Sequence, residues 1–273
     1  TGLAPHRALV VAGQALMVLQ VLTAYALAAE LTGRRWAGVG AALAAAGLST
    51  MPGYYVNWGR YTQLAGQTVL PAAALLTVWA AGGQGDARDG GRPWLRLGLA
   101  AALAVAGLAL THYLVTATFA LLTVAWWLVG AVAARRGGVR AAAATAARLV
   151  GVAVAAVAVA GPWMPAMAEG LLFQTAVAVT ADVVPPAVYG ATGVDAMRAA
   201  LPHLLAEHAR LRVGWPLLAA AGVGAIWALA RRERLAAVGL AWTALLTVAA
   251  FPWAIGLPFG AVLKDFTVAI GLY

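Results

Sequence analysis

Long runs of residues without any charge constrain this sequence more than any motif does. The complete runs cover residues 8–29, 36–51, 64–82, 97–111, 113–134, 149–168, 213–230 and 235–254, and a further one begins near residue 266. At about 1.5 Å rise per residue, a helix crosses the roughly 30 Å hydrocarbon layer with about 20 residues. We therefore predict an all-α fold, a polytopic transmembrane helical bundle with about eight complete spans and the start of a ninth.

The composition excludes an ordinary water-soluble domain. Apolar residues make up 63% of the chain and charged residues 10%, against roughly 45–50% and about 25% in soluble domains. The chain starts with Thr1 rather than Met and ends inside an apolar run. We expect it to be a fragment of a longer protein in which residues 1–273 form a single transmembrane domain.

The residue types present exclude several classes of activity. The chain has no Cys, which rules out thiolate metal sites and cysteine nucleophiles. Its one Ser, Ser49, stands outside a Gly-x-Ser-x-Gly turn, and no Gly-x-x-x-x-Gly-Lys phosphate loop occurs. The net charge of +9 comes from 17 Arg and one Lys, most of them in short loops between apolar runs. Membrane topology explains that placement better than nucleic-acid binding, so we expect no nucleic-acid partner.

The same basic residues predict the orientation. Twelve lie in loops on one side of the predicted spans and six on the other, and cytoplasmic loops carry the excess of Lys and Arg. The cytoplasmic set comprises Arg34, Arg35, Arg88, Arg92, Arg96, Arg135, Arg136, Arg140, Arg148, Arg231, Arg232 and Arg234. We expect a multi-pass protein of the bacterial cytoplasmic (inner) membrane, part of the cell envelope, with its chemistry on the outer side.

Residues 51–67 form the first candidate site, an outer loop rich in aromatic and polar side chains. It gathers Tyr54, Tyr55, Trp58 and Tyr61 around Asn57, Arg60 and Gln63. Aromatic rings stack on sugar faces, and a guanidinium pairs with phosphate oxygens through two parallel hydrogen bonds. The loop thus suits the headgroup of a sugar or sugar phosphate. The alternative is an interfacial aromatic belt with a snorkelling Arg.

The second candidate is Thr111-His112-Tyr113, at the outer end of the fourth run. No loop separates the fourth run from the fifth there. A His there could bind phosphate or transfer protons near neutral pH; alternatively, it caps a tight helix turn. Because the third and fourth runs are joined by a short loop, we predict that they are antiparallel neighbours. Arg60 and His112 should then lie at one depth and line one outward-facing cavity.

The third candidate is the outer segment 169–212, which we predict to be structured without spanning. Residues 196–212 read as an amphipathic helix with a leucine stripe on one side. His203 and Glu207 are four residues apart, but no third metal ligand is evident. A solvated polar face is the better interpretation, and we predict no metal site.

The order of these features resembles the GT-C superfamily of polytopic membrane glycosyltransferases. The similar residues are Trp58-Gly59-Arg60-Tyr61-x-Gln63, the following Leu64-Ala-Gly-Gln, and Thr111-His112 at the end of the next outward run. The layout also resembles bacterial membrane proteins labelled 6-pyruvoyl-tetrahydropterin synthase-related.

The resemblance implies an enzyme that uses a polyprenyl-phosphate-linked sugar at the outer leaflet, with a divalent metal in some members. On this view the substrate-binding residues are Tyr55, Trp58, Arg60, Tyr61, Gln63, His112 and Tyr113. The acidic pair that such enzymes carry in an early outer loop is missing, so no catalytic residue is assigned and the base is expected upstream of Thr1. A transporter or flippase of lipid-linked saccharide and a non-catalytic membrane scaffold remain alternatives.

Overall fold

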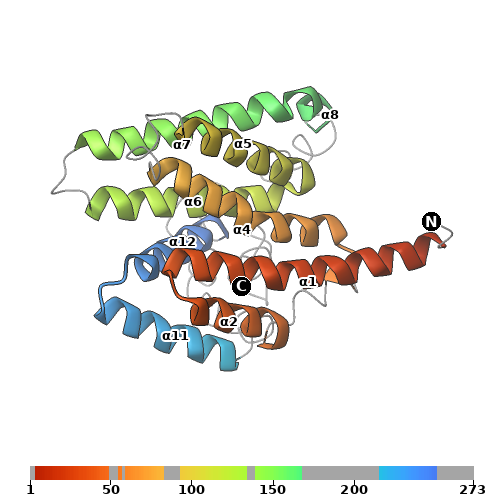
Figure 1. The fold of residues 1–273 in the computed structure, drawn as a ribbon, viewed down its shortest axis with the longest axis horizontal. Coiled ribbons are helices and arrows are strands. Elements are labelled where there is room, and N and C mark those ends of the chain that lie inside the picture. The colour runs from red at the N-terminus through yellow and green to blue at the C-terminus, as the bar shows by residue number, and fades with distance from the viewer. Residues whose placement is uncertain are drawn as a thin grey trace, which may run out of the picture. The chain divides into compact units, whose positions relative to one another are not determined.

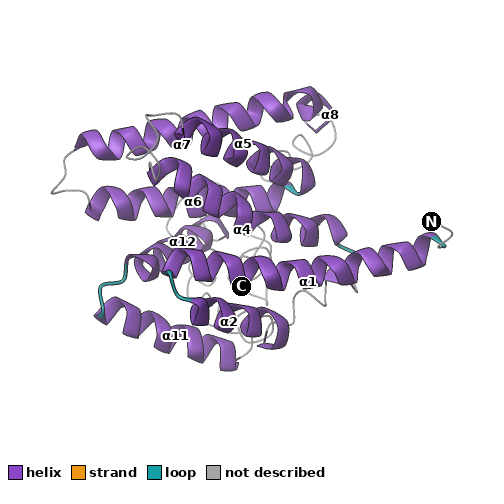
Figure 2. Ribbon diagram, viewed as in Figure 1, coloured by secondary structure: helices purple, strands orange, loops and turns teal. Residues whose placement is uncertain are grey.

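The computed structural model describes residues 4–48, 55–56, 59–82, 93–133, 139–167 and 215–250. Within these ranges the regular structure is helical and contains no strand (Figure 2), which confirms the all-α prediction. The chain divides into two compact units, Thr1–Gly161 and Pro162–Tyr273. Each unit is considered by itself below.

The first unit holds most of the described helices (Figure 1). They are α1 (Pro5–Thr32), α2 (Arg35–Leu43) with a π-helical continuation η1 (Ala44–Leu48), α4 (Tyr61–Gly82), α5 (Pro93–Thr111), α6 (Tyr113–Ala133) and α7 (Val139–Ala160). Each of the first six apolar runs of the sequence therefore contains a helix. Helix α4 is central, because it packs against α1, α5, α6 and α7.

Local sequence signals explain how α1 turns into α2. Pro5 lies in the first turn of α1, where its missing N–H has no helical partner to lose. Gly33 ends the helix with φ 67°, a left-handed conformation that glycine adopts without steric cost. The returning helix then packs closely, because a Cβ atom at Gly38 would lie only 2.8 Å from the carbonyl oxygen of Tyr25.

Two kinds of contact make up the core of the first unit. Branched and aromatic side chains join α4, α5 and α6, with Leu70, Leu108, Val115 and Phe119 in one buried cluster. Alanines join α5 to α7, where Ala102 and Ala106 pack against Ala156 and Ala160. Small residues four apart allow two helix backbones to approach closely, which favours association in lipid.

The helices of the first unit alternate in direction. Gly13 near the start of α1 lies against the ring of Tyr61 at the start of α4, and the Thr68 hydroxyl donates a hydrogen bond to the Leu16 carbonyl at 3.4 Å. Helices α1 and α4 are therefore parallel. The junction of α5 and α6 lies at the same end, because His112 contacts Gly66 of α4.

Five of the described helices are long and apolar enough to cross a membrane. These are Pro5–Thr32, Tyr61–Gly82, Trp94–Thr111, Tyr113–Ala133 and Val139–Ala166. Large apolar side chains such as Leu22, Leu103 and Val154 are exposed on them, as expected of surfaces that face lipid. The chain is a membrane protein, with the lipid bilayer as its surroundings.

The other predicted spans coincide with shorter helices. Helices α2 and η1 lie in the second run, and α11 (Trp215–Ala230) and α12 (Arg234–Ala250) lie in the last two complete runs. None of these helices reaches the length of a full span within the described residues. The count of eight spans therefore stays a prediction.

Two parts of the second unit are described: its first residues, up to Met167, and the helical hairpin of α11 and α12. A 3₁₀ turn over Gly161–Trp163 crosses the boundary between the units and leads into the short α8 (Met164–Met167). Just beyond the end of α11, Arg232 has φ 56°. The Arg232 N–H donates to the Leu229 carbonyl and the Glu233 N–H to the Ala228 carbonyl. These two bonds form a Schellman motif, in which glycine is the usual left-handed residue.

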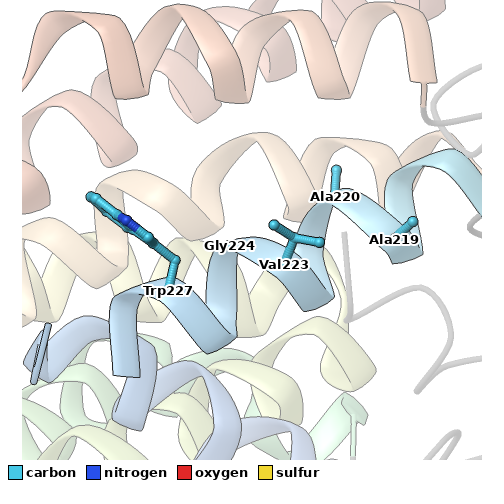
Figure 3. A pocket seen from close by; sticks show the side chains of 5 residues that line it. All are labelled: Ala219, Ala220, Val223, Gly224 and Trp227. Carbon is cyan, nitrogen blue, oxygen red and sulfur yellow. The ribbon is translucent and has the colours of Figure 1, made fainter. Parts of the chain in front are cut away.

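An open apolar depression runs along α11 (Figure 3) and is lined by Ala219, Ala220, Val223, Gly224 and Trp227. The predicted amphipathic segment 169–212 lies outside the described residues.

Candidate functional site

A backbone turn places Arg60 at the start of α4. The Arg60 N–H donates to the Tyr55 carbonyl at 2.8 Å, and the Gly59 N–H donates to the Val56 carbonyl at 3.2 Å. With Gly59 at φ 67°, these bonds have the pattern of a Schellman motif, which explains why glycine precedes this arginine. Arg60 in turn accepts a bond from the Leu64 N–H at 3.1 Å, so its backbone leads directly into α4.

Gln63 lies one turn further along the same face of α4. Its side chain is only 1% exposed, and its Oε1 accepts a hydrogen bond from Nη1 of Arg60 at 3.4 Å. This bond directs the amide oxygen toward Arg60. The Nε2 group is buried and has no hydrogen-bond partner among the described residues. Gln63 therefore keeps an unused donor beside a guanidinium.

His112 occupies the junction between α5 and α6. Its N–H donates to the Leu108 carbonyl at 3.0 Å, and its own carbonyl accepts from Thr116 at 3.1 Å, so the chain turns with its backbone bonds intact. The imidazole stacks on the ring of Tyr113 with a centroid distance of 5.6 Å. Its Nδ1 is buried and, in the part of the chain described, has no hydrogen-bond partner.

Gly66 is what lets His112 approach α4. A Cβ atom at Gly66 would lie 3.3 Å from the Cβ of His112 and 3.3 Å from Cγ2 of Val115. Gly66 follows Gln63 by three residues, so both face the same side of α4. The polar groups of Arg60, Gln63 and His112 thus gather at one end of the bundle.

The charge of Arg60 reaches the imidazole. The pKa of His112 is lowered from its ordinary value of 6.5, first by burial and second by the positive field of Arg60. Both effects disfavour the imidazolium form. At neutral pH the site therefore combines one cation with a neutral imidazole.

The remaining residues of the predicted site divide into three groups. Tyr113 belongs to the site through its stacking on His112. The Tyr61 ring packs on Gly13 of α1, so it faces a helix contact, and Tyr55 is 1% exposed beneath the turn. Trp58 and its neighbour Asn57 lie outside the described residues.

Gly66 stands within Leu64-Ala-Gly-Gln, and the sequence alone assigned it no role. A glycine near the start of an otherwise regular apolar helix was the available signal, because glycine there often marks a close approach of another segment. That signal indicates a close contact but does not identify the partner.

No group of three or more His, Cys, Asp or Glu side chains that could hold a metal ion occurs among the described residues. Of the nine acidic residues, Glu30 and Glu233 are the ones within these ranges. His203 and Glu207 lie outside them. The divalent metal implied by the resemblance therefore has no donor set in the described part of the chain.

The site can supply hydrogen-bond donors and positive charge to an oxyanion. Arg60 offers a planar fork of N–H groups that matches a phosphate, and Nε2 of Gln63 offers a further donor. A bound anion would satisfy Nε2 of Gln63, which has no partner among the described residues, and an unsatisfied buried donor is costly.

The chain belongs to a family of unknown function, DUF6541, whose model matches residues 3–263. No curated protein and no solved structure shows a significant match to this chain.

Proposed function

We propose that this chain is part of a membrane glycosyltransferase that takes its sugar from a polyprenyl-phosphate donor at the outer face of the cytoplasmic membrane. One observation carries the proposal: Arg60, Gln63 and His112 lie together at one end of a bundle of apolar helices. A lipid-linked sugar phosphate presents its anionic group at that depth, with its apolar chain in the bilayer.

The chemistry of the three side chains suits the phosphate of such a donor. Transfer of the sugar leaves negative charge on the phosphate, and donors fixed in advance around a developing charge contribute strongly to catalysis. Arg60 supplies the charge and Gln63 an additional N–H. Exposed apolar side chains on neighbouring helices, such as Leu9 and Val10 of α1, would let a polyprenyl chain remain in lipid.

The distribution of basic residues supports an outward-facing site. Arg60 and His112 lie at one end of the first unit, and Arg148 contacts Ala81 at the cytoplasmic end predicted for α4. This arrangement agrees with the alternation of basic loops in the sequence. The proposed orientation therefore places the site on the side where the sequence has fewer basic residues.

The test is sugar transfer by the full-length protein in lipid nanodiscs. A polyprenyl-phosphate donor carrying a labelled sugar is supplied with membrane acceptors, and the labelled product is counted. Arg60→Ala should abolish transfer, and Arg60→Lys should retain part of it, because an ammonium does not reproduce the bidentate fork. Arg7→Ala is the matched control, since Arg7 is an exposed arginine of α1 toward the same end of the bundle and should leave transfer unchanged.

Three results would contradict the proposal. Wild-type transfer by the Arg60→Ala variant would return Arg60 to an interfacial role. Movement of the intact donor between leaflets without loss of the sugar would identify a flippase. If the full-length protein neither binds the donor nor transfers its sugar, a non-catalytic scaffold would be favoured.

A further inference from the structure

We propose that His112 is the general base of this site, accepting the proton of the acceptor hydroxyl at Nδ1. The inference rests on the proposed function and supplies a role that no acidic residue among the described ranges fills. It assigns the base to this part of the chain rather than to a carboxylate elsewhere in the protein.

The position of the imidazole is the first argument. His112 is held between two helices by backbone bonds at both sides, by stacking on Tyr113 and by contact with Gly66. A group fixed in this way needs little reorganisation to meet a substrate. Its Nδ1 is buried and makes no hydrogen bond to the described residues, so the lone pair there is unused when the proton resides on Nε2.

His112 and Gln63 carry hydrogen-bonding groups of opposite kind. A hydroxyl group both accepts and donates a hydrogen bond. The buried Nε2 of Gln63 is a donor without a described partner, and Nδ1 of a neutral His112 is an acceptor without one. A donor on one side chain and an acceptor on the other are the two groups that a hydroxyl needs, and both residues lie near Arg60.

The charges around His112 suit a base that is free of its proton before reaction. Among the described residues, Arg60 is the charged group whose field acts on it, and Tyr113 is the titratable ring stacked on it. Burial and Arg60 both favour the neutral imidazole. A bound phosphate would offset the charge of Arg60 and raise the pKa of His112, so that the imidazole becomes a stronger base once the donor is in place.

The proposed step balances without a further reactant. The acceptor oxygen forms a bond to the anomeric carbon, and the bond from that carbon to the phosphate oxygen breaks. The phosphate leaves with the bonding electron pair beside Arg60, and the hydroxyl proton passes to Nδ1 of His112. The imidazolium then releases its proton to solvent, which the nearby guanidinium favours.

The test compares the full-length wild type with His112→Gln in nanodiscs. The variant keeps a hydrogen-bonding side chain but no base, so kcat should fall by about 10²–10⁴-fold, the usual contribution of a general base. Binding of the polyprenyl-phosphate donor should change little. The wild-type kcat/KM, which reports the free enzyme, should decline as the pH falls through the lowered pKa of His112, and the residual kcat/KM of the variant should lack this limb. His6→Gln, at an exposed histidine of α1, should behave as the wild type.

Chemical rescue separates catalysis from folding. His112→Ala should regain transfer when imidazole is added, since the small base can enter the space that the ring leaves. In addition, the NMR titration of His112 should move to higher pH when the polyprenyl-phosphate donor is added. If the wild type transfers sugar but His112→Gln keeps its rate and pH profile, this inference is overturned while the proposed function stands. If imidazole fails to rescue His112→Ala, or the wild type transfers no sugar, His112 is not the base.

Discussion

His112 and Gly66 approach each other so closely that a Cβ atom placed on Gly66 would lie 3.3 Å from the Cβ of His112. The junction of α5 and α6 is therefore seated on the first part of α4. Arg60 and Gln63 precede Gly66 in the chain, and Tyr113 follows His112, so the candidate site surrounds this close approach. Gly66 thus determines how deeply His112 sits beside Gln63 and Arg60.

Replacing Gly66 with alanine should displace His112. The added methyl group would lie 3.3 Å from the His112 Cβ and from Cγ2 of Val115, and a Cβ atom attached to a neighbouring backbone cannot turn aside. Overpacking of this kind typically costs about 1–3 kcal/mol, against the roughly 0.5–1 kcal/mol by which alanine is favoured over glycine in a helix interior. We expect a lower midpoint of thermal unfolding in detergent micelles, together with a loss of the sugar transfer proposed for the site.

Gly107→Ala is the matched control for that variant. Gly107 lies within α5, where an added Cβ would have no neighbour within 4 Å. Alanine is favoured over glycine in a helix interior by roughly 0.5–1 kcal/mol, so this variant should be as stable as the wild type or more so. Equal thermal midpoints for both variants would show that the close contact at Gly66 is unimportant.

The pH dependence of stability should also report on His112. Its pKa in the folded chain is lowered below 6.5 by burial and by Arg60, so the unfolded chain binds its proton first as the pH falls. Stability is then fully retained above about pH 6.5, where both states are neutral, and is lost as the pH falls through the folded pKa. Thermal midpoints measured between pH 8 and pH 5 should show this decline.

His112→Gln should flatten that decline, whereas His6→Gln should leave it in place because His6 is exposed. An unchanged pH profile in the His112 variant would mean that the proton is taken up elsewhere. The comparison needs no substrate, so it tests the environment of His112 independently of any activity.

The apolar runs predicted most of the helices because lipid requires long uninterrupted segments with their backbone bonds satisfied internally. The contacts between helices were harder to predict from the sequence. Alanine pairs four residues apart occur throughout the sequence, and nothing in it distinguishes Ala102 and Ala106, which pack on α7, from pairs that face lipid. Pairing of this kind depends on the rotation of each helix, which a uniformly apolar surface does not reveal.

In the candidate site, too, the sequence predicted the general position of the residues but not their individual contacts. The short loop between the third and fourth runs predicted that Arg60 and His112 would lie at one depth. The structure places them at the same end of the first unit, and the outward-facing cavity that they would share stays a prediction. The sequence did not separate the aromatic residues by role. Tyr61 packs on α1 through Gly13, because the first turn of α4 faces that helix, and this contact joins segments almost fifty residues apart.

Arg148 should stabilise the opposite end of α4. Its Nη1 donates to the Ala81 carbonyl at 3.4 Å, near the end of α4, where carbonyl groups lack helical partners and a positive charge is favourable. Arg148→Ala should lower the free energy of unfolding by about 0.5–1.5 kcal/mol. Arg140→Ala, at an exposed position of the same helix, is the control and should change the thermal midpoint little. Equal losses in both variants would indicate a general effect of charge.

The orientation of the chain can be tested with single cysteines, because the sequence contains none. Thr32 at the end of α1 and Thr62 in the first turn of α4 are both exposed, and they lie at opposite ends of parallel helices. The twelve-to-six distribution of basic residues places Thr32 on the cytoplasmic side. In intact cells, a membrane-impermeant maleimide should therefore label Thr62→Cys and spare Thr32→Cys, and permeabilised cells should label both. Labelling of Thr32→Cys alone in intact cells would invert the topology and move Arg60 and His112 to the cytoplasmic face, where a donor displayed on the outer leaflet does not reach them.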